Sequence, residues 1–180
     1  MAERGYERAS INAIATAAGL SPGLVHYHFT SKQQILLALI GRLAEIVRAR
    51  FDQRAVTAET AWQRLDGFID AHVALDDQAN PAAVSCWVAI GAEALRQAEI
   101  RAAYQEAVRS ELTLLESLVR DVLAEQELPT GAAPTIAAGL FAAIQGSYQL
   151  AVAADAAPTG FAAPTLKKMA RGLIHAEAIE

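Results

Sequence analysis

Polar side chains that can donate hydrogen bonds crowd into one short stretch, GLSPGLVHYHFTSK, which runs from Gly19 to Lys32. Hydroxyl, imidazole, phenol and ammonium groups are donors that meet phosphate oxygens and base edges in contacts between proteins and nucleic acids. These residue types, in this order and spacing, therefore indicate a surface that recognises DNA.

Two short helices joined by a glycine turn are expected to position these side chains. Ser10 can cap a first helix over residues 11–18, because its hydroxyl accepts from a backbone N–H that the helix leaves unpaired. Gly19 then supplies the turn, since glycine adopts the left-handed conformation at low steric cost. Ser21 followed by Pro22 predicts the start of a second helix. The residues expected between the two crossing helices are Ile14, Ala15, Ala18, Leu20, Val25 and Phe29.

The segment from Gly5 to Lys32 resembles the helix-turn-helix of the TetR family of one-component transcriptional repressors, and the likeness is strong over about residues 5–50. The resemblance implies that the second helix enters the major groove while hydroxyls and a lysine hold phosphates. His26 departs from the family, which usually has a tyrosine there, so an imidazole would have to replace a phenol at a phosphate. The residues implied to bind DNA are Ser10, Ser21, Pro22, Gly23, Leu24, His26, Tyr27, His28 and Lys32.

The family also has a full first helix before this motif, whereas only Met1 to Arg4 precede Gly5 here. The first helix is therefore expected to be largely missing from this sequence. Either the sequence begins at an internal methionine of a longer protein, which we expect, or the chain is a shortened member with weakened DNA binding. An intact mass of 19.1 kDa for the native protein would exclude the longer start.

Metal, cofactor and catalytic chemistry are not expected. His26 and His28 point about 200° away from each other on a helix, and no nearby Cys, Asp or Glu completes a ligand set. The sequence shows no Ser-His-Asp or Cys-His set and no phosphate-binding glycine loop, so we predict that the protein is not an enzyme. The acidic residues of the long helix expected after residue 99 are interpreted as surface residues beside arginines: Glu111, Glu116 and Asp121.

The charge is divided unevenly along the chain. Residues 1–50 carry six basic and three acidic side chains, a balance of +3, which leaves −8 on the remainder of a chain with net charge −5. This asymmetry places the attraction for phosphate on the N-terminal part.

Cellular location is predicted from three features. No uninterrupted apolar run approaches the roughly 18 residues of a membrane span. No leader with a charged and then apolar pattern is evident at the N-terminus, and the single Cys86 cannot form an internal disulfide. We therefore expect a cytoplasmic protein with no membrane partner.

Past Lys32 the chain is predicted to be helical almost throughout, which gives an all-α fold. Apolar residues spaced by three and four after Ser31 predict a helix that ends near Phe51. Further helices are expected over residues 57–75, 81–95, 99–127, 133–154 and 164–178. We predict two domains, a DNA-binding domain with its linking helix over residues 1–50 and a regulatory and dimerisation domain over residues 51–180.

The last two predicted helices carry little charge, and the first of them mixes small residues such as Gly139 and Gly146 with larger apolar ones. This pattern suits close helix packing. The resemblance implies that both helices pair with their copies in a four-helix bundle. The alternative is an ordinary pair of core helices within one subunit.

The sequence from Cys86 to about Gln149 is similar to the regulatory domain of BetI-type members of the family. The likeness implies a ligand pocket, and such proteins answer to small molecules, some of them quaternary amines such as choline. Aromatic rings with a carboxylate suit a cation, but aromatic residues at helical spacing also form ordinary cores. The candidate ligand-binding residues are Trp62, Phe68, Trp87, Glu93, Tyr104, Phe141, Gln145 and Tyr148.

These observations predict a ligand-responsive repressor. A homodimer would bind a palindromic double-stranded DNA operator, and a small-molecule effector would release it. The alternative function is a helical small-molecule-binding protein that has lost DNA binding. Operator sequence and effector identity stay open at this point.

Overall fold

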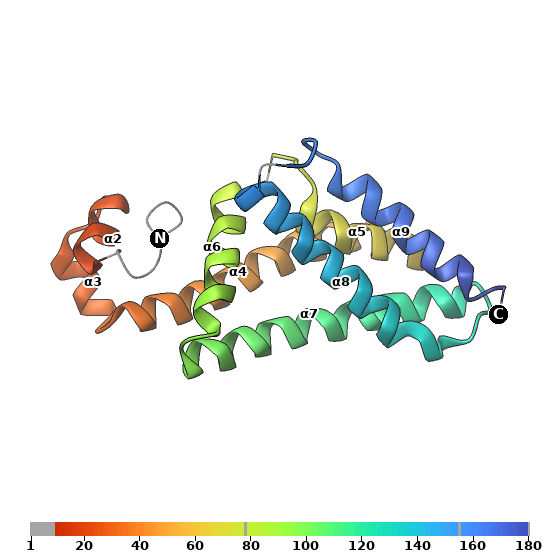
Figure 1. Ribbon diagram of the computed structural model, residues 1–180, viewed down its shortest axis with the longest axis horizontal. Coiled ribbons are helices and arrows are strands. Elements are labelled where there is room, and N and C mark those ends of the chain that lie inside the picture. The colour runs from red at the N-terminus through yellow and green to blue at the C-terminus, as the bar shows by residue number, and fades with distance from the viewer. Residues whose placement is uncertain (1–9, 78, 155, 180) are drawn as a thin grey trace. The chain divides into compact units, whose positions relative to one another are not determined.

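All regular structure is helical in the computed structural model, which describes residues 10–77, 79–154 and 156–179. The all-α prediction is therefore confirmed for these ranges (Figure 1). The prediction of a largely missing first helix concerns residues 1–9, which lie outside the described residues. The elements in chain order are α2 (Ile11–Ala17), α3 (Pro22–His28), α4 (Lys32–Ala55), α5 (Ala61–Val73), α6 (Pro81–Ala94), α7 (Ala98–Glu125), the 3-10 turn η1 (Thr130–Ala132), α8 (Ala133–Gln149), the π-helical turn η2 (Leu150–Ala154) and α9 (Ala162–Ala176).

The chain forms two compact units. Unit 1 comprises Met1–Glu45 and Asn80–Ala107, and unit 2 comprises Ile46–Ala79 and Val108–Glu180. Both α4 and α7 are continuous helices that begin in unit 1 and end in unit 2. The core of unit 1 is formed by α4, α6 and α7 through Leu36, Ile40, Leu43, Ile90, Ala94 and Ile100. In unit 2, α8 packs against both α5 and α9, and α5 also packs against α9.

Side-chain caps set several helix starts. Thr60 accepts from the Gln63 N–H at 3.1 Å, so α5 begins at Ala61 and not at the predicted residue 57. Asn80 accepts from the Ala83 N–H at 3.0 Å, which starts α6 at Pro81 as the sequence predicts.

The ends of α4 and α7 add two details to the sequence expectations. The predicted end of α4 near Phe51 is too early, because Phe51 is buried and the helix continues for another turn to Ala55. At the end of α7, Glu127 adopts a left-handed φ of 57°, and the Leu128 N–H donates to the Leu123 carbonyl at 2.9 Å. This reversed turn satisfies a carbonyl that the helix end leaves without a partner.

The 25 residues Thr130–Ala154 are long and apolar enough to cross a membrane by length and composition, since an 18-residue window within them has a mean hydropathy of 1.4. The sequence expectation of no membrane-length apolar segment is therefore qualified, because it counted only uninterrupted runs. Ile136, Leu140 and Ile144 on this helix are buried inside unit 2, where α8 packs on α5 and α9. Burial of this segment is partial, because 39% of its apolar window is buried inside the described structure.

Candidate DNA-binding and ligand-binding sites

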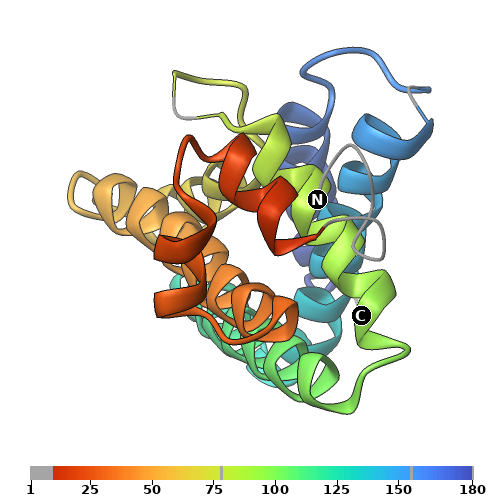
Figure 2. The same cartoon turned by 90° about the vertical axis from the view of Figure 1, so that its left-hand side faces the viewer.

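A short turn connects α2 to α3 (Figure 2). Three residues, Ser10, Gly19 and Ser21, set the two helix starts and this turn. Ser10 caps α2 by accepting from the Ala13 N–H at 3.1 Å, and Ser21 caps α3 by accepting from the Leu24 N–H at 3.2 Å. Gly19 between them has a φ of +68°, which L side chains rarely adopt. Ala15 is fully buried and Val25 is 6% exposed, so these two residues hold the helices together.

The predicted DNA-binding residues lie on the open face of this pair. Eight of the nine are exposed, and Tyr27 reaches 83%, while Lys32 in the first turn of α4 is half-buried. The hydroxyls of Ser10 and Ser21 use their oxygen lone pairs for capping, so each O–H can still donate to a phosphate. The predicted residues are therefore accessible to a partner, and their role in binding DNA stays a prediction.

Two details of this face were not foreseen. Leu20 does not fill the corner between the helices, because it is 46% exposed, and the seven-residue helices bury only Ala15 and Val25. The rings of Tyr27 and His28 meet edge to face with centroids 5.1 Å apart. The orientation of each of these two exposed rings therefore depends on the other.

Three predicted ligand-binding residues belong to unit 1. Trp87 and Tyr104 stack with ring centroids 4.8 Å apart, a separation that leaves no space for a ligand between the two rings. Burial raises the pKa of the Tyr104 phenol. The buried Glu93 carboxylate accepts from the Gln97 side-chain amide at 3.0 Å. This group is therefore satisfied largely by local contacts.

Three further predicted residues, Phe68, Phe141 and Tyr148, are buried in unit 2 and surround His72. The His72 ring lies 4.4 Å from the Phe68 ring and 6.2 Å from the Phe141 ring, centroid to centroid. Its Nδ1 donates to the Phe68 carbonyl at 3.0 Å, and its Nε2 lies 3.4 Å from Glu111 Oε2. We refer to Phe68, His72, Glu111, Phe141 and Tyr148 as the α5 cluster.

The sequence reasoning missed two members of the α5 cluster. His72 lies four residues after Phe68 and therefore on the same face of α5. The interpretation of Glu111 as a surface residue was wrong, because its side chain is only 13% exposed. Its position between Val108 and Leu115, at spacings of three and four, places it on the apolar stripe of α7 and was the available signal.

The remaining predicted ligand residues, Trp62 and Gln145, lie outside the α5 cluster. Gln145 is half-buried on α8. Trp62 is half-buried at the start of α5, with the Arg171 guanidinium 5.0 Å from its ring centroid. It lines an open hollow of about 610 Å³ in unit 2 together with Gln126, Leu128, Arg171, Ile174, His175 and Ala178.

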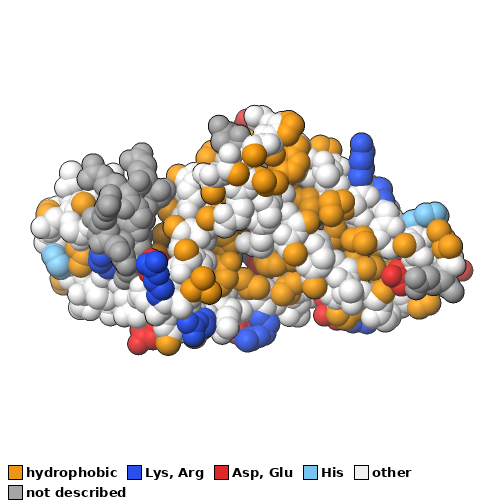
Figure 3. Space-filling model, viewed as in Figure 1, with side chains coloured by type: hydrophobic (Ala, Val, Ile, Leu, Met, Phe, Trp, Pro, Cys, Tyr) orange, Lys and Arg blue, Asp and Glu red, His pale blue; other side chains and the backbone are white. Residues whose placement is uncertain are grey.

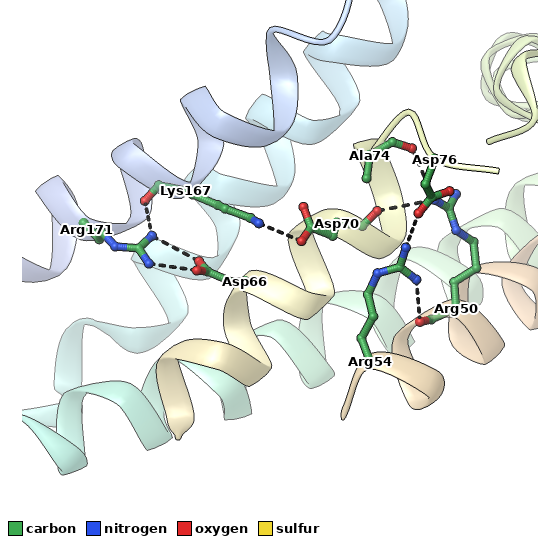
Figure 4. A network of polar contacts seen from close by, with 8 residues as sticks. All are labelled: Arg50, Arg54, Asp66, Asp70, Ala74, Asp76, Lys167 and Arg171. Carbon is green, nitrogen blue, oxygen red and sulfur yellow. Dashed lines mark hydrogen bonds and ion pairs between the residues drawn. The ribbon is translucent and has the colours of Figure 1, made fainter. Parts of the chain in front are cut away.

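Ion pairs tie α5 to its neighbours in unit 2 (Figure 4). Arg171 on α9 pairs with Asp66 at 2.7 Å, and Lys167 pairs with Asp70 at 2.6 Å. The hydrogen bond that the Arg171 guanidinium donates to Asp66 raises the pKa of Arg171. At the other end of α5, Arg50 and Arg54 from α4 both bind the Asp76 carboxylate.

Metal-ligating side chains do not gather in the part of the chain that the structure describes. No group of three or more His, Cys, Asp and Glu side chains there could hold a metal ion.

A helix-turn-helix pair followed by a helical body defines a class of transcriptional regulators that carry DNA recognition and regulation in one polypeptide. Residues 1–39 match the family described as bacterial regulatory proteins, tetR family. Residues 61–177 match the family described as BetI-type transcriptional repressor, C-terminal.

Curated relatives agree with these matches. The HTH-type transcriptional regulator BetI of Rhizobium meliloti (strain 1021) is 32% identical over 150 residues, which cover 81% of this chain and 69% of the relative. The regulator of the same name from Agrobacterium fabrum (strain C58 / ATCC 33970) is 34% identical over 167 residues, 90% of this chain and 76% of the relative. The chain therefore belongs to the TetR family, as a transcriptional regulator of the BetI repressor type.

Solved structures share the fold. A TetR transcription regulator from Haloarcula marismortui ATCC 43049 superposes with a TM-score of 0.80 at 20% identity, covering 98% of this chain and 90% of that chain. A putative transcriptional regulator from Saccharomonospora viridis, solved in complex with choline, gives 0.75 at 24% identity, covering 97% and 88%. The family relatives are regulators and not enzymes.

Proposed function

We propose that this chain is a ligand-responsive repressor that acts in the cytoplasm, binds a palindromic operator as a homodimer and is released by a small molecule. The observation that carries this proposal is the exposed outer face of α3, where Gly23, Leu24 and Tyr27 are open to solvent while Val25 anchors the helix on α2. Such a helix can enter the major groove with its first turn against base edges.

Operator binding is tested with duplex fragments from beside the protein's own gene, by gel shift and fluorescence anisotropy. We expect one fragment to bind much more tightly than a scrambled duplex of the same length. If no fragment is preferred, the alternative of a ligand-binding protein without DNA recognition is favoured.

Effector binding is proposed to involve the aromatic residues Trp87 and Tyr104 of unit 1 and the aromatic residues of the α5 cluster. Choline is the first probe, because a structural neighbour is named as its complex, and aromatic rings with a carboxylate suit a quaternary amine. Choline is expected to lower operator affinity and to protect the α5 cluster from hydrogen exchange. An unchanged affinity at millimolar choline would reject this effector class.

The homodimer is proposed to form on α8 and α9; in the view of Figure 3 hydrophobic side chains gather along α8, while Lys and Arg side chains project from α9. On α8, a Cβ added at Gly139 or Gly146 would meet nothing within 4 Å, so no contact inside the described chain requires glycine there. On α9, Met169 and Leu173 are 42% and 39% exposed. A second copy of the same surface would bury these residues and allow close helix approach.

Sedimentation velocity tests the dimer. A chain of these 180 residues is expected to sediment as a species of twice its 19.1-kDa mass. Gly146→Leu should produce a folded monomer, because the added side chain has open space within one subunit but none between packed helices. Thr113→Leu on the exposed side of α7 is the control and should remain dimeric.

A further inference from the structure

The last turn of α5 is held by side chains from two other helices of unit 2. A helix end leaves carbonyls without partners, and two of them here are satisfied from outside the helix. From α4, Arg50 Nη2 donates to the Ala74 carbonyl at 3.2 Å. From α8, Tyr148 Oη donates to the His72 carbonyl at 3.3 Å. The end of α5 is therefore a hydrogen-bonded junction between α4 and α8.

Charge strengthens the α4 side of this junction. Arg50 Nη2 also lies 3.0 Å from one Asp76 oxygen, and Arg54 Nη2 binds the other oxygen. Arg54 Nη1 donates in turn to the Arg50 carbonyl at 2.9 Å (Figure 4). The Arg50 side chain is 11% exposed, whereas the Asp76 side chain is 36% exposed, so water screens these charge-assisted contacts in part. We refer to Arg50, Arg54 and Asp76 as the arginine clamp.

The arginine clamp is not fully satisfied. Within the described residues, the buried Arg50 Nε has no hydrogen-bond partner. A buried donor without an acceptor is unfavourable, so Arg50 Nε is the least satisfied group of the clamp.

The α5 cluster also contacts the last turn of α5, through His72. His72 belongs to the turn through its carbonyl and to the cluster through its ring, which contacts Phe68 and faces Glu111. A change of contacts around the His72 ring or Tyr148 must therefore alter forces on the carbonyls that Arg50 holds.

We propose that the last turn of α5 is the coupling element of this regulator, which transmits the state of the α5 cluster to α4 through the arginine clamp. Since α4 is continuous from Ala55 back to Lys32, a shift of its clamped end reaches the residues that follow α3. This inference rests on the proposed function, because only an effector-responsive regulator has a signal to transmit. A coupling element must have two arrangements, and effector binding and DNA binding must each shift the equilibrium between them.

A double-mutant cycle tests the coupling without knowledge of the effector. The probe is a duplex that the native protein selects from a random library, and the reading is its Kd. Tyr148→Phe removes the bond to the His72 carbonyl, and Asp76→Asn weakens the clamp. Asp52→Asn is the matched control, because it removes the same charge from the exposed Arg48–Asp52 pair of α4.

Tyr148→Phe is expected to shift the operator Kd by about fivefold in the native and Asp52→Asn backgrounds, within the usual range of coupling between sites. In the Asp76→Asn background the shift should fall below about twofold, because the transmitting contact is weakened. An equal shift in all backgrounds, or none in the native protein, would overturn the proposal. Should Asp76→Asn fail to fold, Arg54→Gln removes one arm of the clamp and is expected to reduce the shift in the same direction.

Hydrogen exchange separates this inference from the proposed function. If the native protein selects no duplex, the proposed function fails, and coupling is then read from deuterium uptake over residues 46–55. Tyr148→Phe should change that uptake in the native background and leave it unchanged in the Asp76→Asn background. Uptake that ignores Tyr148→Phe, or responds equally in both backgrounds, would overturn the coupling itself.

Discussion

Gly23 occupies the first turn of α3 without any reason inside the described structure. Its φ is not positive, and a Cβ built there meets nothing within 4 Å. Glycine is unfavourable within helices because it loses more backbone freedom on folding than alanine does. Close approach of the duplex in the proposed binding mode would account for the absence of a side chain at this position.

Opposite effects on folding and binding are expected from Gly23→Ala. The free energy of unfolding should rise by up to about 1 kcal/mol, while operator affinity falls because the methyl group meets DNA. Chemical denaturation and fluorescence anisotropy measure the two effects. Gly41→Ala is the control, since Gly41 lies within α4 and also has open space around its Cβ; it should stabilise the protein and leave operator affinity unchanged.

Lys32 and Leu24 are expected to differ in what they contribute to DNA binding. Lys32→Gln should weaken binding to every duplex and reduce the magnitude of the salt dependence by about one unit of slope, because one phosphate contact is lost. Leu24→Ala should mainly change which bases are preferred. A binding-site selection at two salt concentrations checks both expectations, and a Lys32→Gln effect confined to one sequence would contradict the phosphate assignment.

At the scale of elements, the sequence predicted helices best where local signals decide. Ser10 and Ser21 cap helices as their positions indicated, because a side-chain cap depends on a few neighbouring residues. The start of α5 was missed because Thr57 and Thr60 are both plausible caps, and Thr57 instead donates to the Arg54 carbonyl.

The candidate sites were predictable to different degrees for a physical reason. The exposed face of α3 depends on one helix and its cap, so its residues could be named from the sequence. The α5 cluster needs α5, α7 and α8 to pack together, and no local pattern fixes that His72 meets Glu111. Glu111 was predicted to lie on the surface because its side chain is charged. Its position on the apolar stripe of α7 indicated the opposite, and the structure shows it 13% exposed.

The two faces of α9 should respond differently to truncation. Leu166 is 2% exposed, so Leu166→Ala should lower the free energy of unfolding by about 2–5 kcal/mol, the usual cost of a cavity in a core. Leu173 is 39% exposed, so Leu173→Ala should cost the monomer little while weakening the proposed dimer. Urea denaturation at fixed protein concentration and sedimentation equilibrium measure the two properties; equal loss of folding stability in both variants would contradict the division of faces.

At the scale of the whole molecule, an acidic protein with net charge −5 must bind DNA through a local excess of positive charge. Operator binding is therefore expected to weaken at least about a hundredfold when KCl rises from about 50 to about 200 mM, as counterion release requires for several phosphate contacts. Anisotropy titrations at several salt concentrations measure this slope. A Kd that does not change with salt would contradict a phosphate-based interface.

The unit boundary at Glu45 and Ile46 lies inside α4 and not in a loop. Anyone who joins the DNA-binding part of this chain to the body of another regulator must therefore preserve helical phase at the junction. One inserted residue there would turn residues 32–45 of α4 by about 100° about the helix axis relative to residues 46–55, and seven would restore the phase to within about 20°. A chimera is thus more tolerant of a seven-residue insertion than of a single one, although the longer insertion changes more of the sequence.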